Sequence, residues 1–169
     1  MQLIMLIGPS GSGKSTLARE LANHDEHAVV LSADNVLEDF AYADEISYEE
    51  AYENFYHQAL DIVLQTAEEA FSRGQNVIWD QTNLKREDRA WRLDLVPDNY
   101  TKTAVCFVAD FETCQANILN RVATGGRHIP DFVLRQQIVD MCEPDFDEGF
   151  DKIVKQVVTV PEADPEPCI

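Results

Sequence analysis

Residues 8–15 read Gly-Pro-Ser-Gly-Ser-Gly-Lys-Ser and match the phosphate-binding pattern G-x-x-x-x-G-K-[ST] at every fixed position. An apolar run from Leu3 to Ile7 precedes the motif, and residues 16–21 read as the opening of a helix. Glycines allow backbone N–H groups to close around phosphate oxygens, and the N-terminus of a helix adds favourable partial charge. The stretch therefore predicts a strand, a phosphate-binding loop and a helix that hold ATP or GTP with Mg²⁺. A Gly/Ser-rich surface turn is the alternative, and the strand and helix on either side argue against it.

The motif also predicts a role for each of its residues. We expect Lys14 to reach the β- and γ-phosphates and the Ser15 hydroxyl to ligate Mg²⁺. The loop by itself does not separate a kinase from an ATPase or a nucleotide-dependent switch. The remaining contacts to the nucleotide are expected from the neighbouring loop residues Gly8, Ser10, Gly11, Ser12, Gly13 and Thr16.

Five short apolar runs alternate with longer helical patterns along the chain. The runs are nearly continuous in apolar residues, as strands buried on both faces are. The alternation predicts βαβ units and a mostly parallel sheet in an α/β domain spanning residues 1–160, with an acidic, proline-containing tail at 161–169. The candidate strands are residues 3–7, 28–31, 77–79, 104–108 and 153–160.

The clearest helical pattern runs from Tyr48 to Ser72, where apolar and aromatic side chains recur at three- and four-residue steps. Ser47, with Glu50 three residues later, is typical of a capping box at its start. The aromatic stripe of this helix is interpreted as core rather than as a stacking platform. Further helices are expected after Asp110, ending near Gly125-Gly126, and after Pro130.

Charge and cysteine content exclude several classes of protein. The 169 residues include 31 Asp and Glu against 13 Lys and Arg, a formal net charge of −18. A field of that sign argues against a general basic nucleic-acid coat and against a polybasic membrane anchor. A local basic cleft stays possible, because exposed charges are screened beyond about 8 Å at physiological salt. The four cysteines show no C-x-x-C spacing, which makes a zinc site improbable.

The N-terminus lacks the positive region of a signal peptide, and no apolar run approaches the ~18 residues of a membrane span. We therefore expect a cytoplasmic protein that does not bind membranes. Nothing in the sequence predicts its oligomeric state.

Asp34 and Asp80 follow the second and third predicted strands. In open α/β sheets ligands bind beyond the carboxyl ends of the strands, so both carboxylates are expected on the edge that holds the phosphate loop. A kinase needs a base for the attacking hydroxyl and a carboxylate beside Mg²⁺, and these two residues are the candidates. The alternative for each is a helix cap or a turn former.

A basic segment follows Asp80 and its neighbours Gln81, Thr82 and Asn83. Four of the 13 basic residues fall within eight positions, Lys85, Arg86, Arg89 and Arg92. They are interpreted either as a patch for the phosphate of an acceptor or as a solvated helix face paired with neighbouring acids. The sequence does not decide between the two.

Arg121 and Arg127 flank Thr124-Gly125-Gly126, a combination that predicts a mobile lid after a helix. Guanidinium groups on such a lid stabilise the charge of a transferring phosphoryl group, and closure excludes water from the reaction. The alternative is an ordinary C-terminal helix cap with favourable charge.

Taken together, these motifs resemble those of the polynucleotide 5′-kinase-like group of P-loop kinases, which includes phage members. The matching stretches are residues 8–15, 32–34, 80–84, 121–130 and 148–151. The resemblance implies an adenylate-kinase-like three-layer sandwich with five parallel strands in the order 2-3-1-4-5 and a small helical lid. It also implies that Asp34 is the general base, that Asp80 organises the metal or acceptor side together with Thr82 and Asn83, and that Arg121 and Arg127 clamp the ATP phosphates. For a phage protein the compartment would be the host cytoplasm.

One position departs from this family pattern. An arginine commonly follows the base by three residues and holds a phosphate of the acceptor, but here the position is Leu37, and residues 32–65 contain no Lys or Arg. Arg86, Arg89 and Arg92 are candidates to substitute for it.

The first hypothesis is therefore an ATP- and Mg²⁺-dependent kinase acting on a polynucleotide 5′-hydroxyl end. The second keeps the chemistry and changes the acceptor to a hydroxymethylated base in phage DNA or to a small nucleoside-like or sugar metabolite. The third is a nucleotide-dependent switch.

Overall fold

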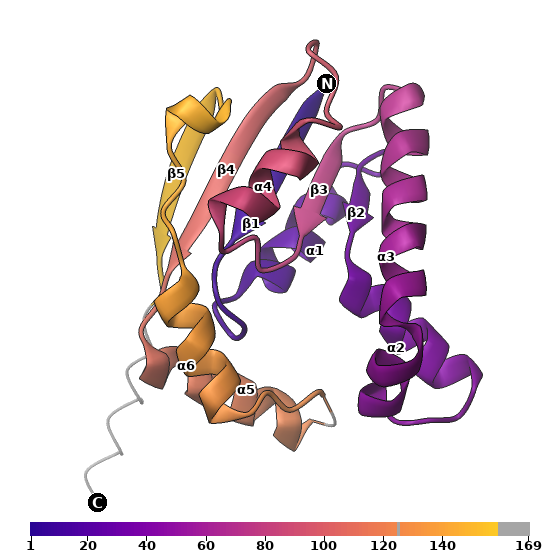
Figure 1. Cartoon of the computed structure of the whole chain (residues 1–169), viewed down its shortest axis with the longest axis vertical. Coiled ribbons are helices and arrows are strands. Elements are labelled where there is room, and N and C mark those ends of the chain that lie inside the picture. Colours follow the sequence, from indigo (N-terminus) through magenta and orange to yellow (C-terminus); the bar gives the residue numbers. More distant parts are fainter. Residues whose placement is uncertain (125, 159–169) are drawn as a thin grey trace, which may run out of the picture.

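The computed structural model describes residues 1–124 and 126–158, and its core is a five-stranded sheet whose paired strands are all parallel. The strand order is β2-β3-β1-β4-β5 (Figure 1), which confirms the α/β class and the order that the resemblance implied. The strands are β1 (Gln2–Ile7), β2 (Val29–Leu31), β3 (Val77–Asp80), β4 (Thr101–Val108) and β5 (Lys152–Val157).

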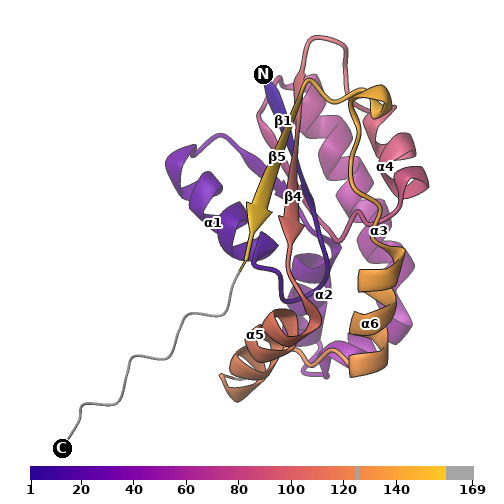
Figure 2. The ribbon, with the colours of Figure 1, turned by 90° about the vertical axis from the view of Figure 1, so that its left-hand side faces the viewer.

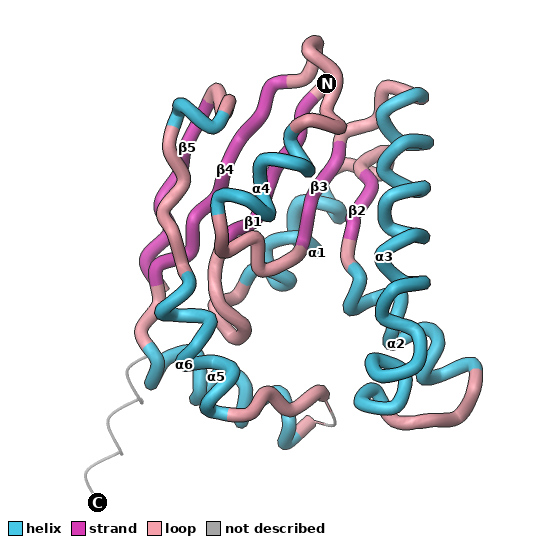
Figure 3. The backbone as a smooth tube through the Cα atoms, in the orientation of Figure 1, coloured by secondary structure: helices cyan, strands magenta, loops and turns pink. Residues whose placement is uncertain are grey.

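Helices cover both faces of this sheet and give three layers. Figure 2 shows α1 (Lys14–His24) on one face and α3 (Tyr48–Ser72) and α4 (Arg86–Leu93) on the other. Three further helices, α2 (Ala33–Ala43), α5 (Phe111–Ala123) and α6 (Asp131–Asp140), lie beyond one end of the sheet (Figure 1). Figure 3 shows the loops that follow β1, β2 and β3 at that same end, which places the predicted site between the sheet and these helices.

Both faces of β1 are buried, and this explains its continuous apolar run. Leu3 and Met5 pack in the cluster that contains Val63 of α3, whereas Leu6 packs in the cluster that contains Ala18 of α1. A central parallel strand therefore has no polar face to alternate with.

The edge strand β5 departs from that expectation. Its side chains are mostly exposed, and only Ile153 is partly buried against the core. The strand was predicted to reach residue 160 but ends at Val157, with residues 159–169 outside the described part, as is the predicted tail. β4 begins three residues earlier than predicted, because Thr101 to Thr103 pair with β1 despite their polarity.

The long helix has the bounds that its pattern predicts, Tyr48–Ser72. The Ser47 hydroxyl accepts from the Glu50 N–H, and the Glu50 carboxylate accepts from the Ser47 N–H, so the capping box is formed. α2 was not predicted, because its short apolar pattern follows β2 after one residue. Ser32 caps it by accepting from the Asn35 N–H. Within the described residues, no helix has the length and apolar character needed to cross a membrane.

Candidate active site

The phosphate-binding loop joins β1 to α1, and its backbone requires glycine at two positions. Gly11 and Gly13 have φ angles of 80° and 92°, which side-chain-bearing residues rarely adopt. A Cβ at Gly11 would also collide with the backbone carbonyl of Cys114 on α5. The glycines of the motif thus allow the loop to turn tightly and to lie directly against the helix behind it.

Two amide side chains that the sequence interpretation missed fix this loop in place. The Asn117 Nδ2 donates to the Gly11 carbonyl at 2.8 Å, and the Ser10 N–H donates to Gln137 Oε1, also at 2.8 Å. Asn117 lies on α5 and Gln137 on α6, more than 100 residues along the chain from the loop. A single Asn or Gln in a helix matches no motif, so these contacts could be identified only from the folded structure.

Lys14 is buried at the start of α1, where its Nζ donates to the Pro9 carbonyl at 2.7 Å. Burial lowers the pKa of Lys14 to about 8, against the opposing charge of Asp80. The ammonium is therefore charged at neutral pH. Because the nearby carboxylates do not fully neutralise this charge, the site favours an anionic ligand.

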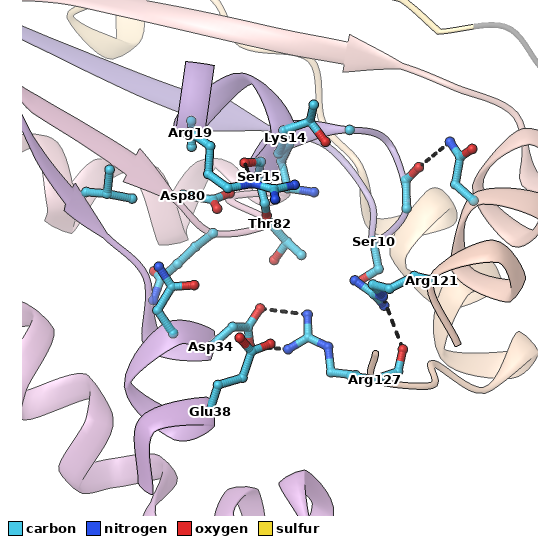
Figure 4. A pocket seen from close by; sticks show the side chains of 18 of the residues that line it. Ser10, Lys14, Ser15, Arg19, Asp34, Glu38, Asp80, Thr82, Arg121 and Arg127 are labelled. Atoms are coloured by element: carbon cyan, nitrogen blue, oxygen red, sulfur yellow. Dashed lines mark hydrogen bonds and ion pairs between the residues drawn. The ribbon is translucent and has the colours of Figure 1, made fainter. Parts of the chain in front are cut away.

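Ser15 and Asp80 lie side by side at the floor of the loop (Figure 4). Burial raises the pKa of Asp80, while the Ser15 hydroxyl hydrogen bond and the charge of Lys14 act in the opposite direction. One hydroxyl and one carboxylate are hard oxygen ligands of the kind that hold Mg²⁺ together with substrate phosphates. Among the described residues no cluster of three or more His, Cys, Asp or Glu could form an all-protein metal cage. The donor set thus fits a metal that phosphates help to hold.

A cavity of about 720 Å³ opens between this loop, the end of the sheet and the predicted lid (Figure 4). We call it the nucleotide cavity. It gathers, from separate parts of the chain, Gly11, Gly13, Lys14, Ser15 and Thr16 of the loop, Asp34, Glu38, Asp80 and Thr82, and Arg121 and Arg127.

Asp34 faces this cavity from the first turn of α2 and forms an ion pair with Arg127 (Figure 4). The Arg127 Nη2 donates to Asp34 Oδ2 at 2.7 Å, and the Tyr48 hydroxyl donates to Asp34 Oδ1 at 2.8 Å. Arg127 also donates to the Tyr48 oxygen at 2.7 Å and lies over the Tyr48 ring. These three side chains, the Asp34 cluster, join α2, α3 and the segment before α6.

The Asp34 cluster keeps its carboxyl ionised. Partial burial acts to raise the pKa of Asp34, but hydrogen bonding and charge from Arg127, with smaller contributions from Tyr48 and Lys14, lower it overall. The side chain is still 45% exposed, so a proton can reach it from the cavities. A carboxylate that is charged at neutral pH and open to ligands is suited to accept a proton.

Arg121 and Arg127 carry nitrogen atoms that no group in the described residues satisfies. The Arg121 Nε donates to the Arg127 carbonyl at 3.2 Å, but its buried Nη2 has no partner there, and neither has the buried Nε of Arg127. Unpaired buried guanidinium nitrogens are costly unless an anion binds them. Their place on the wall of the nucleotide cavity fits the negative charge of a triphosphate.

A second cavity of about 430 Å³ lies on the other side of Asp34, and we call it the acceptor cavity. The two cavities share the wall residues Ser10, Asp34, Gln81, Thr82 and Arg127. The remaining walls come from the start of α2, from α3 and α4, and from α6 with the segment leading into it: Ala33, Tyr48, Glu49, Tyr52, Glu53, Tyr56, Arg92, His128, Ile129, Pro130, Val133 and Gln137.

This cavity corrects the interpretation of the aromatic stripe on α3. The second half of the stripe is core, as Val63 and Phe71 show. In the first half, Tyr48, Tyr52 and Tyr56 line the acceptor cavity, and Tyr52 is 46% exposed, whereas Phe55 packs against the core as predicted. Helical periodicity is the same for a side chain that packs in a core and for one that lines a cavity, so the pattern could not separate them.

The interpretation of Arg89 as part of a patch for an acceptor phosphate also needs correction. Its guanidinium is fully buried, pairs with Glu148 at 2.7 Å and donates to the backbone carbonyls of Asn83, Leu84 and Cys142. With its donors used in this way, Arg89 supports the fold and has none left to hold an acceptor phosphate.

The structure places Arg86 and Asn83 outside both cavities as well. Arg86 pairs with Asp147 at 2.7 Å on the surface. Asn83 is buried with a φ of 49°, and its Nδ2 donates to the Leu6 carbonyl at 2.7 Å. Thr82 lines both cavities, and its carbonyl accepts from the Gly8 N–H at 3.0 Å, so this residue ties the loop to the end of β3.

Comparison with known families agrees with the loop, the sheet and the cavity. The model of the AAA domain family AAA_33 matches residues 3–144. The chain belongs to this family. No curated protein matches the sequence.

Solved structures of several kinases share the fold of this domain. A presumed kinase from Chloroflexus aurantiacus has a TM-score of 0.73 at 23% identity, with 97% of this chain and 88% of that one covered. A gluconokinase from Sinorhizobium meliloti has a TM-score of 0.58 at 18% identity, covering 95% and 84%. A fungal RNA kinase has a TM-score of 0.57 at 16% identity, covering 95% of this chain and 39% of that one. At these identities the likeness is one of fold.

Proposed function

We propose that the protein is an ATP- and Mg²⁺-dependent kinase that transfers the γ-phosphate of ATP to an alcohol, with Asp34 as the general base. The observation that carries the proposal is the position of Asp34, an ionised carboxylate on the wall shared by the nucleotide cavity and the acceptor cavity. A base in that position can take a proton from a hydroxyl in one cavity while the hydroxyl oxygen attacks phosphorus in the other.

The nucleotide side is assembled from the loop. The backbone of residues 8–16 surrounds the phosphates, Lys14 places its charge beside the β- and γ-phosphates, and Ser15 with Asp80 holds Mg²⁺ or its waters. When bound, Mg²⁺ neutralises charge on the β- and γ-phosphate oxygens. Arg121 and Arg127, both on the wall of the nucleotide cavity, then place their guanidinium charge beside the transferring group.

The transfer step moves one proton and one phosphoryl group. The acceptor oxygen forms a bond to the γ-phosphorus, the bond from that phosphorus to the bridging oxygen of ADP breaks, and the hydroxyl proton passes to Asp34. For this, Arg127 leaves Asp34 Oδ2 and turns to the phosphoryl oxygens, since its Nη2 is engaged by that carboxylate oxygen. The Tyr48 hydroxyl keeps its bond to Oδ1 and so holds the carboxylate in place while Oδ2 is free.

For the acceptor, the first candidate is a polynucleotide 5′-hydroxyl end. The resemblance in the motifs supports it, and a fungal RNA kinase and a subunit of an RNA repair complex share the fold. The tyrosines of the acceptor cavity offer faces on which a base could stack.

The second candidate is a small nucleoside-like or sugar metabolite. Glu49 and Glu53 line the acceptor cavity, and the chain has no Lys or Arg between Arg19 and Arg73, so a long polyanionic strand has few cations to follow. A gluconokinase shares the fold over most of both chains.

One assay distinguishes these acceptors. The protein is incubated with γ-labelled ATP and Mg²⁺, and separately with 5′-hydroxyl DNA, 5′-hydroxyl RNA and a pool of nucleosides, sugars and sugar acids. Labelled ends support the first candidate, and label confined to small molecules supports the second. ATP hydrolysis that no acceptor stimulates would contradict the proposed function.

A further inference from the structure

We infer that Arg92 binds an anionic group, a carboxylate or a phosphate, on the molecule whose hydroxyl Asp34 deprotonates. The inference rests on the proposed function and adds the chemical class of the acceptor. Arg92 lies on α4 and lines the acceptor cavity, where it is, with Arg127, one of two arginines on the described walls. Arg127 is paired with Asp34 here and is assigned to the phosphoryl group during transfer, so Arg92 is the arginine there that is left for the acceptor.

Its neighbours on the same segment are already paired. Lys85 pairs with Asp140, Arg86 with Asp147 and Arg89 with Glu148. Within residues 1–124 and 126–158, no carboxylate lies within ion-pair distance of Arg92, although the chain has 31 acidic residues. An unpaired guanidinium in a cavity of so acidic a protein points to a ligand of opposite charge.

The guanidinium is also held in one position. Its centre lies 4.4 Å from the ring centroid of Trp91 and 5.9 Å from that of the buried Trp79, and its Nη1 donates to the Asp88 carbonyl. Its Nε is buried without a partner among the described residues. Burial lowers the pKa of Arg92, so the charged form is maintained there at a cost that a bound anion would offset.

The place of Arg92 relative to Asp34 suits a molecule with two ends. Asp34 lies on α2 and is bonded to Tyr48, the first residue of α3, whereas Arg92 comes from α4 on another part of the cavity wall. Tyr48 and Tyr56 of the same wall are eight residues apart, about two helical turns, so the cavity is long enough for a hydroxyl and an anion to be recognised at separate points. A ring between them can lie against Tyr52, the exposed member of that stripe.

The two tryptophans of the chain make this inference directly measurable, because both lie against Arg92. Intrinsic fluorescence is recorded while the protein is titrated with two matched pairs of probes. Thymidine 3′-monophosphate against thymidine tests a phosphate, and glucuronate against glucose tests a carboxylate. We expect a saturable change with the anionic member of at least one pair and none with its neutral partner.

Three variants complete the test. Arg92→Gln should weaken the anionic probe about 10- to 100-fold, and Arg92→Lys should weaken it less, since it keeps the charge. Arg135→Gln is the control, because Arg135 also stacks on an aromatic ring, Phe111, but lines neither cavity, and it should bind as the wild type does. Thermal unfolding of each variant confirms that it is folded.

Equal binding by Arg92→Gln, equal responses to charged and neutral probes, or no response to any of the four probes would overturn the inference. Asp34→Asn separates this outcome from failure of the proposed kinase activity. That variant should lose transfer but keep the fluorescence response, because the titration measures binding at Arg92 alone.

Discussion

The nucleotide cavity and the acceptor cavity share one wall but are built in different ways. A large part of the nucleotide cavity is lined by one continuous stretch, residues 10–16, whose glycines permit the positive φ angles that its tight turn requires. The acceptor cavity is assembled mainly from α2, α3, α4 and α6 with the segment before it, which approach each other only in the folded chain. A local motif therefore specifies what the protein holds as donor, whereas tertiary packing specifies what it accepts. Substitutions on the two sides should accordingly change different kinetic constants.

Arg127 stands on the shared wall, so its loss should have the largest effect. Arg127→Gln removes a guanidinium from the transferring phosphoryl group and should lower kcat about 10³-fold. It also removes the charge that lowers the pKa of Asp34, so the acid limb of the pH–rate profile should move to higher pH. Steady-state kinetics across pH measure both effects, and an unchanged acid limb would mean that Asp34 is not the titrating base.

Arg89→Gln tests whether Arg89 supports the fold, whereas Arg92 of the same helix α4 lines the acceptor cavity. It leaves Glu148 buried without its partner, at 2% side-chain exposure, and should lower the free energy of unfolding by about 3–5 kcal/mol. Arg86→Gln breaks an exposed pair and should unfold as the wild type does. Denaturant unfolding gives both values. If Arg89→Gln had normal stability but bound the acceptor poorly, Arg89 would have to be assigned to the acceptor site.

Tyr48→Phe should affect the acceptor side alone. The variant loses the donor to Asp34 Oδ1, so kcat should fall about tenfold, the cost of one hydrogen bond to a charged group. The dissociation constant of ATP should stay the same, because the Tyr48 hydroxyl does not line the nucleotide cavity. Calorimetric titration gives the dissociation constant of ATP, and steady-state kinetics give kcat. If Tyr48→Phe weakened ATP binding as much as it lowered kcat, Tyr48 would contribute to both cavities.

The pH dependence of nucleotide binding should affect the donor side alone and should be absent at neutral pH. The pKa of Lys14 is lowered to about 8, so its charge is present below that pH and is lost above it. The dissociation constant of ATP should therefore rise by about tenfold per pH unit above roughly pH 8 and be flat below it. Lys14→Met should bind ATP weakly at all pH values and should not show this rise above pH 8. A wild-type affinity that is constant to pH 10 would contradict the lowered pKa.

The same contrast accounts for what could be predicted from the sequence. The start of the loop and both ends of α3 were predicted correctly, because a glycine motif and a capping box are encoded within a few residues, although α1 begins at Lys14, two residues earlier than predicted. Arg89 and Arg92 could not be told apart, since they lie on one short helix and their fates depend on contacts formed by distant segments. Glu148, the partner of Arg89, is 59 residues away. For the same reason the loop contacts of Asn117 and Gln137, and the role of Tyr48 beside Asp34, became visible only in the folded structure.

In the proposed reaction Asp34 takes a proton from the acceptor and takes little part in holding ATP. The most direct test measures ATP affinity and single-turnover transfer on the same preparation of Asp34→Asn, with Asp39→Asn as the control, since Asp39 lies on α2 but lines neither cavity. We expect Asp34→Asn to bind ATP as the wild type does and to transfer phosphate about 10²- to 10⁴-fold more slowly, whereas the control does both normally. Transfer at the wild-type rate, or a loss of ATP binding as large as the loss of transfer, would contradict this role of Asp34.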